Sequence, residues 1–417
     1  MGRFPVNNKS FIKILSANSL SKLGDSMHEL VFLLLTISIV NNDFKLIGII
    51  YFIKFIPYLL FGFLGGHLAD NYNNKILMLF SDFSRAIITF LLCFLTYFNM
   101  INLLLLGAIA FCMTLLRIVF QPCFQSTIPI IVEKKDLASA NSFMQISEEI
   151  GTIIGPSLAG ILITHMNQSI VFALDACTYL ISFIFIATFT VTRNRSNIQN
   201  KIISFKFLIG DTVQGIKNIF NDGQLLITII ISGFCILFVS SIIRFIFPIY
   251  LKTNFTSDTK IIGFALSTIA LGTVIGALLY NKIWHTSSPK KLLFFWSAYG
   301  ASLLMITAFP SQTWVITIAF IIGLIGAWVD ICLVTNIQML STNENIGKNF
   351  SVFSTLANTG EASSGLIASF TIAMTSVLFC VNFFSALVII IPLIMLFTKK
   401  WGASRSFTHK NKPTVTY

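Results

Sequence analysis

The chain has 417 residues, of which 55% are hydrophobic and only 11% charged, and it contains 42 Phe. Because soluble domains average about a quarter charged residues, this composition excludes an ordinary water-facing surface and predicts an integral membrane protein. The formal net charge of +12 therefore bears on the sidedness of membrane loops, and we expect no nucleic acid as a partner.

Twelve apolar runs follow one another along the chain, each long enough for the helix of about 20 residues that crosses a bilayer. The predicted spans are residues 11–40, 44–66, 76–98, 101–124, 141–165, 168–190, 225–250, 259–283, 290–309, 312–335, 350–374 and 376–398. We therefore expect an all-α integral membrane protein with 12 transmembrane helices in two six-helix halves.

The longest polar stretch divides these spans six and six. We expect an N-terminal half at residues 1–190, a cytoplasmic linker at 191–224, a C-terminal half at 225–398 and a basic cytoplasmic tail at 399–417. An amphipathic pattern in the linker, "FKFLIGDTVQGIKNIF", predicts a surface helix along the membrane, and a plain tether is the alternative. Weak similarity between the loops after spans four and ten suggests that the halves are parallel repeats.

Loop charge predicts the orientation of the chain. With the N-terminus inside, the inner segments hold twenty Lys and Arg residues, and the outer loops hold only Lys45, Lys252 and Lys260. Cytoplasmic loops of membrane proteins carry such an excess of basic residues. We therefore expect both termini in the cytoplasm. The bias toward Asn, Lys, Ile and Phe favours a bacterial cytoplasmic (inner) membrane.

Charges inside the first span predict a functional face. Lys22, Asp25 and Glu29 lie within roughly 60° of one another at ~100° per residue, and an ion in mid-membrane normally faces a cavity or a partner. Asp25 and Glu29 are therefore candidates for proton coupling, and Lys22 is a candidate for lining a substrate cavity. A structural ion pair between Lys22 and Asp25 is the alternative.

The other spans carry scattered charges. Arg85 has Asp82 three residues before it, which predicts a local ion pair. Glu148 in span five is a further candidate for a proton carrier or for the partner of a substrate cation. In the C-terminal half the candidates for lining a substrate cavity, with interhelical ion pairs as the alternative, are Arg244, Asp330 and Glu361.

A polar stretch, "GGHLADNYNNKILML", follows span two. We expect a cytoplasmic turn here, in which Gly65 and Gly66 let helices approach closely. Asp70 is expected to accept hydrogen bonds from the start of span eleven, near residues 346–350, because a helix N-terminus favours an anion. Gly66, Asp70 and Lys75 are the predicted cytoplasmic gate.

Two motifs resemble those of the major facilitator superfamily. The loop pattern Gly-x-x-x-Asp-Arg-x-Gly-Arg-Arg is matched at Gly66, Asp70 and Lys75, with Asn at residues 71, 73 and 74 in place of the usual Arg, Gly and Arg. These departures predict a weaker gate. The stretch "GTIIGPSLAG" is similar to the antiporter motif Gly-x-x-x-Gly-Pro-x-x-Gly-Gly, in which small residues permit close packing and proline bends the helix. The motif residues are Gly151, Gly155, Pro156 and Gly160.

Three further stretches, "LGDSM", "FALDACTYLISF" and "IQMLSTNENIGKNFSVFS", resemble the macrolide-efflux and siderophore-exporter branch of that superfamily. The resemblance implies a secondary active transporter that exports drugs, peptides or siderophores by proton exchange. It also implies a proton-transfer role for Arg117 in span four, for which a structural role is the alternative. The branch includes lysophospholipid transporters, so lipid transport stays open, as does a transporter-like receptor that moves nothing.

The sequence contains no motif for nucleotide hydrolysis or metal binding. A G-x-x-x-x-G-K-[ST] phosphate loop is absent, and the 7 Cys and 5 His residues show no metal-ligand spacing. We therefore expect neither an enzyme nor a cofactor. The expected partners are a small-molecule substrate, protons and the lipid bilayer, and the expected state is a monomer.

Overall fold

The computed structural model describes residues 8–40, 44–189, 217, 219–220, 222–255, 260–284, 286–309, 311–342 and 344–397. Nearly all of these residues are helical, and no strand occurs among them. The surface helix expected in the linker and the basic tail at 399–417 lie outside the described residues.

The N-terminal half consists of six long helices. A short 3-10 turn, η2 (Lys134–Asp136), precedes the fifth of them. The helices are α1 (Lys9–Ile39), α2 (Phe44–Asn71), α3 (Asn74–Tyr97), α4 (Leu103–Ile131), α5 (Leu137–His165) and α6 (Gln168–Thr188).

The C-terminal half supplies six more spans. The first of them is interrupted, because α8 (Gly223–Ser240) passes through a π-helical segment, η3 (Ser241–Ile246), into α9 (Phe247–Asn254). A 3-10 turn, η4 (Met305–Thr307), follows α11. The remaining helices are α10 (Lys260–Ile283), α11 (Pro289–Leu304), α12 (Gln312–Leu340), α13 (Ile346–Met374) and α14 (Val377–Phe397).

The predicted fold class is confirmed. Among the described residues, 9 helices are long and apolar enough to cross a membrane by composition alone. The other three spans are α1, which carries several charges, α11, which has only 16 residues, and α13, which is rich in polar residues. Their place among the other spans, rather than their hydropathy, identifies them.

The boundary of span two was predicted wrongly. The stretch from Gly65 to Asn71 is helical and belongs to α2, and only Tyr72 and Asn73 connect α2 to α3. The glycines serve packing rather than a turn, because a Cβ on Gly65 would lie 1.9 Å from the carbonyl oxygen of Ile118 in α4. Asn73 then starts α3 by accepting hydrogen bonds from two backbone amides of its first turn.

The two halves repeat one packing scheme. Helix α1 packs against α5 and α6, as α8 packs against α13 and α14. Helix α2 packs against α4 as α10 packs against α12, and α3 against α6 as α11 against α14. This correspondence agrees with the parallel repeats suggested by the sequence.

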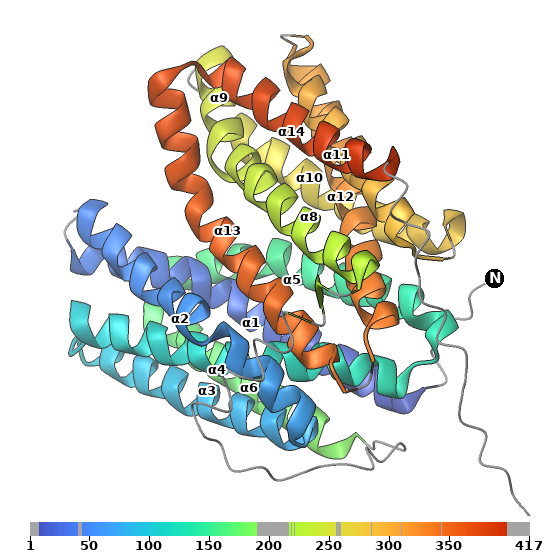
Figure 1. Ribbon diagram of the computed structural model, residues 1–417. Coiled ribbons are helices and arrows are strands. Elements are labelled where there is room, and N and C mark those ends of the chain that lie inside the picture. Colours follow the sequence, from blue (N-terminus) through green and yellow to red (C-terminus); the bar gives the residue numbers. More distant parts are fainter. Residues whose placement is uncertain are drawn as a thin grey trace, which may run out of the picture.

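Contacts between the halves join α2 to α13 and α5 to α10 and α12. The halves approach one another where α2 ends and α13 begins, and they diverge toward the left of Figure 1, where α2 begins and α13 ends. We call the closed side, at Asp70 and Ile346, the latch end.

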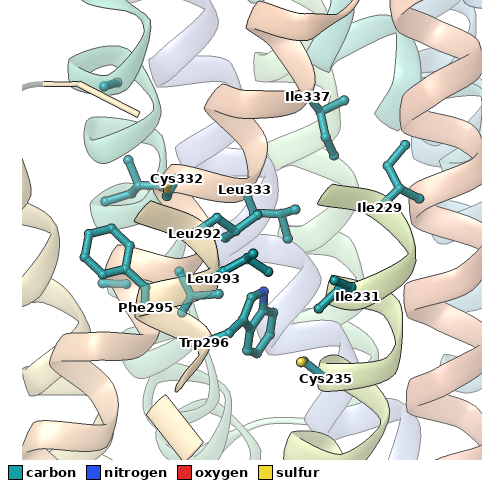
Figure 2. Packing of buried hydrophobic residues seen from close by; sticks show 14 of the residues in the cluster. Ile229, Ile231, Cys235, Leu292, Leu293, Phe295, Trp296, Cys332, Leu333 and Ile337 are labelled. Carbon is teal, nitrogen blue, oxygen red and sulfur yellow. The ribbon is translucent and has the colours of Figure 1, made fainter. Parts of the chain in front are cut away.

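The C-terminal half is held by apolar packing. Figure 2 shows side chains of α8, α11 and α12 meeting in one cluster, in which Trp296, Leu333 and Ile229 are buried. The indole nitrogen of Trp296 donates to the Ser232 hydroxyl at 3.0 Å. Because lipid is as apolar as these side chains, van der Waals contact and such interhelical hydrogen bonds hold the helices together. The N-terminal half differs, because charged side chains occupy its centre.

The arrangement makes a prediction about topology. Met100 and Gln312 are exposed on one side of the bundle, and Glu133 and Glu344 are exposed on the opposite side. In a background without native cysteines, an impermeant maleimide should label Met100→Cys and Gln312→Cys in intact cells. It should label Glu133→Cys and Glu344→Cys only after permeabilisation. The reverse pattern would contradict the cytoplasmic assignment of the latch end.

Candidate functional site

Two adjoining pockets lie among the helices of the N-terminal half. Asp25, Arg85 and Arg117 border both of them. Lys22 and Glu148 border the first, and His28, Glu29 and Lys54 border the second. Two buried carboxylates, Asp175 and Asp82, pair with His28 and Arg85 of this set. We call the ten charged or titratable side chains the N-terminal polar core: Lys22, Asp25, His28, Glu29, Lys54, Asp82, Arg85, Arg117, Glu148 and Asp175.

Asp25 lies at the centre of this core. Its carboxylate accepts a hydrogen bond from the hydroxyl of Tyr179 on α6. Arg117, Arg85 and Lys22 each attract it electrostatically. The alternative interpretation, an ion pair between Lys22 and Asp25, is not found among the described residues. Asp25 therefore links α1 to α6 and is surrounded by cations from three helices.

Glu29 pairs with a lysine that the sequence reasoning missed. The Lys54 ammonium on α2 forms an ion pair with the Glu29 carboxylate, and it lies 5.0 Å from the centre of the Phe32 ring. The signal in the sequence was the position of Lys54 inside a predicted span, because an unpaired charge there is costly and predicts a partner.

The expected pair of Arg85 with Asp82 is confirmed. The guanidinium donates to Asp82, whose second oxygen accepts from Ser182 at 2.6 Å. The same guanidinium lies 4.6 Å from the Phe120 ring centre and 4.5 Å from that of Tyr179. Removing one partner of a buried pair of this kind typically costs about 3–5 kcal/mol, because it leaves an uncompensated charge.

Arg117 is placed differently from Arg85. It lies midway along α4, its side chain is exposed toward the pockets, and within the described residues it has no hydrogen bond or ion pair. Asp25 attracts it electrostatically. Arg117 is thus an available cation beside Asp25.

His28 and Asp175 form a pair that the sequence reasoning also missed. The Nδ1 atom of His28 lies 2.8 Å from an oxygen of Asp175 on α6, which is fully buried. The second oxygen of Asp175 has no hydrogen-bond partner. Asp175 belongs to "FALDACTYLISF", and its charge inside a predicted span was the available signal.

The antiporter-like motif packs α5 against α1. A Cβ on Gly155 would lie 2.6 Å from the Cβ of Ser26, and one on Gly151 would lie 3.2 Å from the amide of Leu23. Close approach is therefore observed at both glycines. Gly160 does not share this contact, because a Cβ there would meet nothing within 4 Å. Pro156 lies inside α5.

Glu148 sits next to this motif on α5. The side-chain amide of Asn18 on α1 donates to it at 3.1 Å. Glu148 borders the same pocket as Lys22 and Asp25 of α1.

The C-terminal candidates divide into a pair and a single charge. Arg244 on η3 and Glu361 on α13 form an ion pair at 2.8 Å, so the interhelical alternative is observed for both. Asp330 on α12 is exposed and has no ion-pair partner in the described ranges. Glu149, Glu148 and Glu361 repel it electrostatically.

Asp70 connects the halves at the latch end. Its two carboxylate oxygens accept hydrogen bonds from the backbone amides of Gly347 at 2.8 Å and Lys348 at 2.9 Å. These amides are at the N-terminus of α13, where the helix dipole favours an anion. A Cβ on Gly66 would lie 2.7 Å from the Gly347 carbonyl oxygen. The contact expected from the sequence is present.

Lys75 was predicted to belong to the same gate, and the structure corrects this. Its ammonium donates to the backbone carbonyls of Ala187 at 2.7 Å and Phe189 at 2.9 Å. These carbonyls are at the C-terminal end of α6, where a cation is favoured. Lys75 therefore joins α3 to α6 within the N-terminal half and does not cross between halves.

The three asparagines that replace the usual Arg and Gly residues each make local contacts. Asn71 donates to the His67 carbonyl at 2.9 Å, and Asn73 caps α3. The Asn74 amide donates to Ser126 on α4 at 3.1 Å. These bonds order the α2–α3 connection without reaching the C-terminal half.

A second contact between the halves was missed by the sequence reasoning. The Asn141 amide on α5 donates to Thr335 at 2.8 Å and to Gln338 at 2.7 Å, both on α12. Ser142 donates to the Ala277 carbonyl on α10. Buried polar side chains at close helix contacts signal such bonds, but their partners cannot be paired from sequence.

Comparison with known proteins decides the family. Residues 2–415 match the major facilitator family described as transmembrane secretion effector. The chain belongs to this family. It is therefore a multi-pass membrane transporter rather than an enzyme, and transporters of this superfamily handle small-molecule substrates.

Its relatives include exporters. The chain is 24% identical to the staphyloferrin A transporter of Staphylococcus aureus, over 68% of this chain and 70% of that protein. It is 24% identical to the putative bacilysin exporter BacE of Bacillus subtilis, over 96% of both chains. It is 21% identical to macrolide efflux protein A of Streptococcus pyogenes, over 54% of this chain and 55% of that protein.

Solved structures show the same fold. A bacterial homologue of the iron transporter ferroportin, in an outward-facing state, superposes with a TM-score of 0.72 at 15% identity, covering 93% of this chain and 97% of that one. The proton:xylose symporter XylE superposes with a TM-score of 0.69 at 12% identity, covering 93% and 94%. At these identities the likeness establishes the fold alone.

The packing of α5 on α1 makes a prediction about stability. Gly155→Ala should destabilise the protein by about 1–3 kcal/mol, because the new methyl group overlaps Ser26. The matched control, Gly160→Ala, should change stability by at most about 1 kcal/mol, and in the stabilising direction. Thermal unfolding of both variants in detergent measures this difference. Equal melting temperatures would show that α1 and α5 are not in close contact.

Proposed function

We propose that this protein is a proton-coupled exporter of a small amphipathic molecule, a drug, siderophore or peptide, that works by alternating access between its two six-helix halves. It resides in a bacterial cytoplasmic membrane with both termini in the cytoplasm and acts as a monomer. The observation that supports this most strongly is the charged face of α1, which borders two pockets at the centre of the N-terminal half.

Proton coupling is inferred from the placement of Asp25 and Arg117. A transporter that exchanges protons needs a carboxylate that water can reach in one state and that a cation can stabilise when it is ionised. Asp25 borders both pockets, and Arg117 lies beside it with no ion pair in the described part of the chain. Proton binding to Asp25 would remove its electrostatic attraction for Arg117, which would then act on other anions, including those of a substrate.

Substrate binding is inferred for the space between the halves. Arg244 and Glu361 are both accessible there, with side-chain exposures of 54% and 31%. Asp330 adds an exposed negative charge from α12. Together with Lys22 on the N-terminal side, these groups suit a molecule that carries polar groups on an apolar framework. The named activities of the relatives, staphyloferrin A transport, putative bacilysin export and macrolide efflux, fit this class.

The cytoplasmic gate is inferred from the latch end. Asp70 bonds to the start of α13, and Asn141 bonds to α12, so polar contacts hold α2 and α5 against the opposite half. Opening this side requires all of these bonds to break. Glu29, Arg117 and Glu148 stay candidates for proton transfer beside Asp25.

Asp25→Asn tests the coupling. In proteoliposomes with an acidic lumen, the wild type should accumulate at least one of three probes, a macrolide, staphyloferrin A or bacilysin. Asp25→Asn should reduce accumulation by at least about tenfold, because the amide cannot carry a proton. Glu133→Gln, which neutralises an exposed acid on a connection between helices, is the matched control. Full accumulation by Asp25→Asn would refute the assignment, and transport indifferent to the gradient would favour the lipid transporter.

Asp70→Asn tests the gate. Loss of the charged acceptor should weaken the latch by about 1.5 kcal/mol, equivalent to roughly tenfold more of the state that is open at the cytoplasmic end. Ser351→Cys is a suitable reporter, because residue 351 is 1% exposed and faces Gly66. Its maleimide labelling rate should rise in Asp70→Asn and stay unchanged in the control Asp136→Asn. An unchanged rate in Asp70→Asn would exclude the gate role.

A further inference from the structure

Charged and titratable side chains well inside the spanning helices differ in whether they have a partner. Several are joined in pairs: His28 with Asp175, Lys54 with Glu29, Arg85 with Asp82, and Arg244 with Glu361. Others accept hydrogen bonds from neutral side chains: Asp25, Glu148 and Glu149. In the part of the chain that the structure describes, Lys22, Arg117 and Asp330 have neither an ion pair nor a side-chain hydrogen bond.

These three unpartnered charges are accessible. A charge inside the membrane is costly unless it faces a cavity or a partner. Arg117 and Asp330 are exposed, and Lys22 is partly exposed. Lys22 and Arg117 border the same pocket in the N-terminal half. Asp25 attracts both cations electrostatically, but its hydrogen bond comes from Tyr179 and it forms no ion pair with either. The N–H donors of Lys22 and Arg117 are therefore available to a bound molecule.

Hydrogen bonds between the halves fix the level of Asp330 relative to this pocket. Asn141 on α5 donates to Thr335 on α12 at 2.8 Å. Going away from the latch end, Glu148 is seven residues beyond Asn141 and Asp330 is five residues beyond Thr335, or about 10 Å and about 8 Å along the two helices. Glu148 borders the pocket and repels Asp330 electrostatically. Asp330 thus lies at the level of the pocket, on the opposite half.

The surroundings of Asp330 suit an organic cation. Glu148 and Glu149 of α5 are both within electrostatic range of it, so a cation placed beside Asp330 is attracted from both halves. Tyr299 on α11 is within electrostatic range of Asp330 and Glu149. An aromatic ring beside carboxylates is a favourable environment for an ammonium group.

The unpartnered charges therefore differ in sign between the halves, with two cations on the N-terminal side and an acid on the C-terminal side. We propose that the substrate is an amphipathic zwitterion, whose anionic group binds Lys22 and Arg117 and whose ammonium group binds Asp330. This names the substrate class of the proposed function and rests on that function for the place where substrate binds.

Closure of the halves around a substrate explains why both charges are needed. Enclosure removes water from all three side chains, and a charge left without a partner after desolvation is strongly destabilising. A purely anionic molecule would leave Asp330 unpaired, and a purely cationic one would leave Lys22 and Arg117 unpaired. A zwitterion matches both walls and joins the halves.

Two kinds of small molecule carry this pair of charges: a short peptide with free ends and the headgroup of a zwitterionic phospholipid. The first probes are leucyl-leucine, phenylalanyl-leucine and tryptophanyl-leucine, each compared with its N-acetyl and C-amide forms. Binding to the full-length protein in nanodiscs is measured by isothermal titration calorimetry at pH ~6.5, where both ends of a free dipeptide are charged. Either modification should raise Kd at least about tenfold, because it leaves a charge of the protein unpaired.

Charge-neutralising variants assign each end of the dipeptide to its wall. In Asp330→Asn, acetylation should change Kd by less than about twofold, while amidation keeps its effect. In Lys22→Gln/Arg117→Gln the reverse is expected, and Lys22→Gln alone should reduce the effect of amidation if the double variant does not fold. Glu133→Gln and Lys134→Gln, at exposed positions of the connection between α4 and α5, are the matched controls and should keep both effects. A merely structural role would weaken all forms of the dipeptide alike.

Three results would overturn the inference. The free dipeptides could fail to bind up to about 10 mM, well above usual KM values, the modified forms could bind as tightly as the free ones, or both effects of modification could persist in the variants. Glycerophosphoethanolamine, added as a competitor, separates the two sources: displacement of the dipeptide assigns a lipid headgroup, and no displacement assigns a peptide.

Failure of the inference and failure of the proposed function can be told apart. If the dipeptides show the expected pattern but no probe is exported in exchange for protons, the inference stands and the proposed function fails. If a probe is exported in exchange for protons but binding ignores the charges of the dipeptide, the proposed function stands and the inference fails.

Discussion

The cost of a charge inside the membrane organises this molecule. An ionised side chain at mid-membrane costs about 2.5–3.5 kcal/mol on insertion scales, and the N-terminal half contains ten charged or titratable side chains around two pockets. They are tolerated because each meets a partner on another helix, a neighbouring charge or the pockets. Bonds such as that of Tyr179 to Asp25 therefore fix α6 against α1, and the glycines of α5 bring a third helix to the same face.

The two halves share a packing scheme and differ in what fills it. The C-terminal half is built on apolar side chains around Trp296 and holds its charges at the surface facing the other half. The N-terminal half concentrates charge at its centre. In the proposed function this asymmetry divides the roles: the N-terminal half would bind protons, and the C-terminal half would offer Arg244 and Asp330 to the substrate. The Asp70 latch joins the halves away from the N-terminal polar core and away from Arg244 and Asp330.

Much of this architecture was predictable from local sequence, and the partners were not. Apolar runs identified most of the spans because helix length and bilayer thickness are matched, and the acceptor role of Asp70 followed from helix electrostatics. Lys75 was assigned to the gate by motif alone, whereas its ammonium bonds to backbone carbonyls at the end of α6. His28 and Asp175 are distant in sequence, and only the packing of α1 on α6 brings them together. A single sequence carries no information on such pairs.

Exchange of protons for substrate is best measured by following the protons themselves. Proteoliposomes loaded with a pH-sensitive dye and prepared without a pH gradient receive whichever of the macrolide, staphyloferrin A or bacilysin the protein transports. We expect the lumen to become more alkaline as the compound enters, since protons leave in exchange, and a protonophore to abolish the change. Entry of the compound with no change in lumen pH would contradict proton exchange.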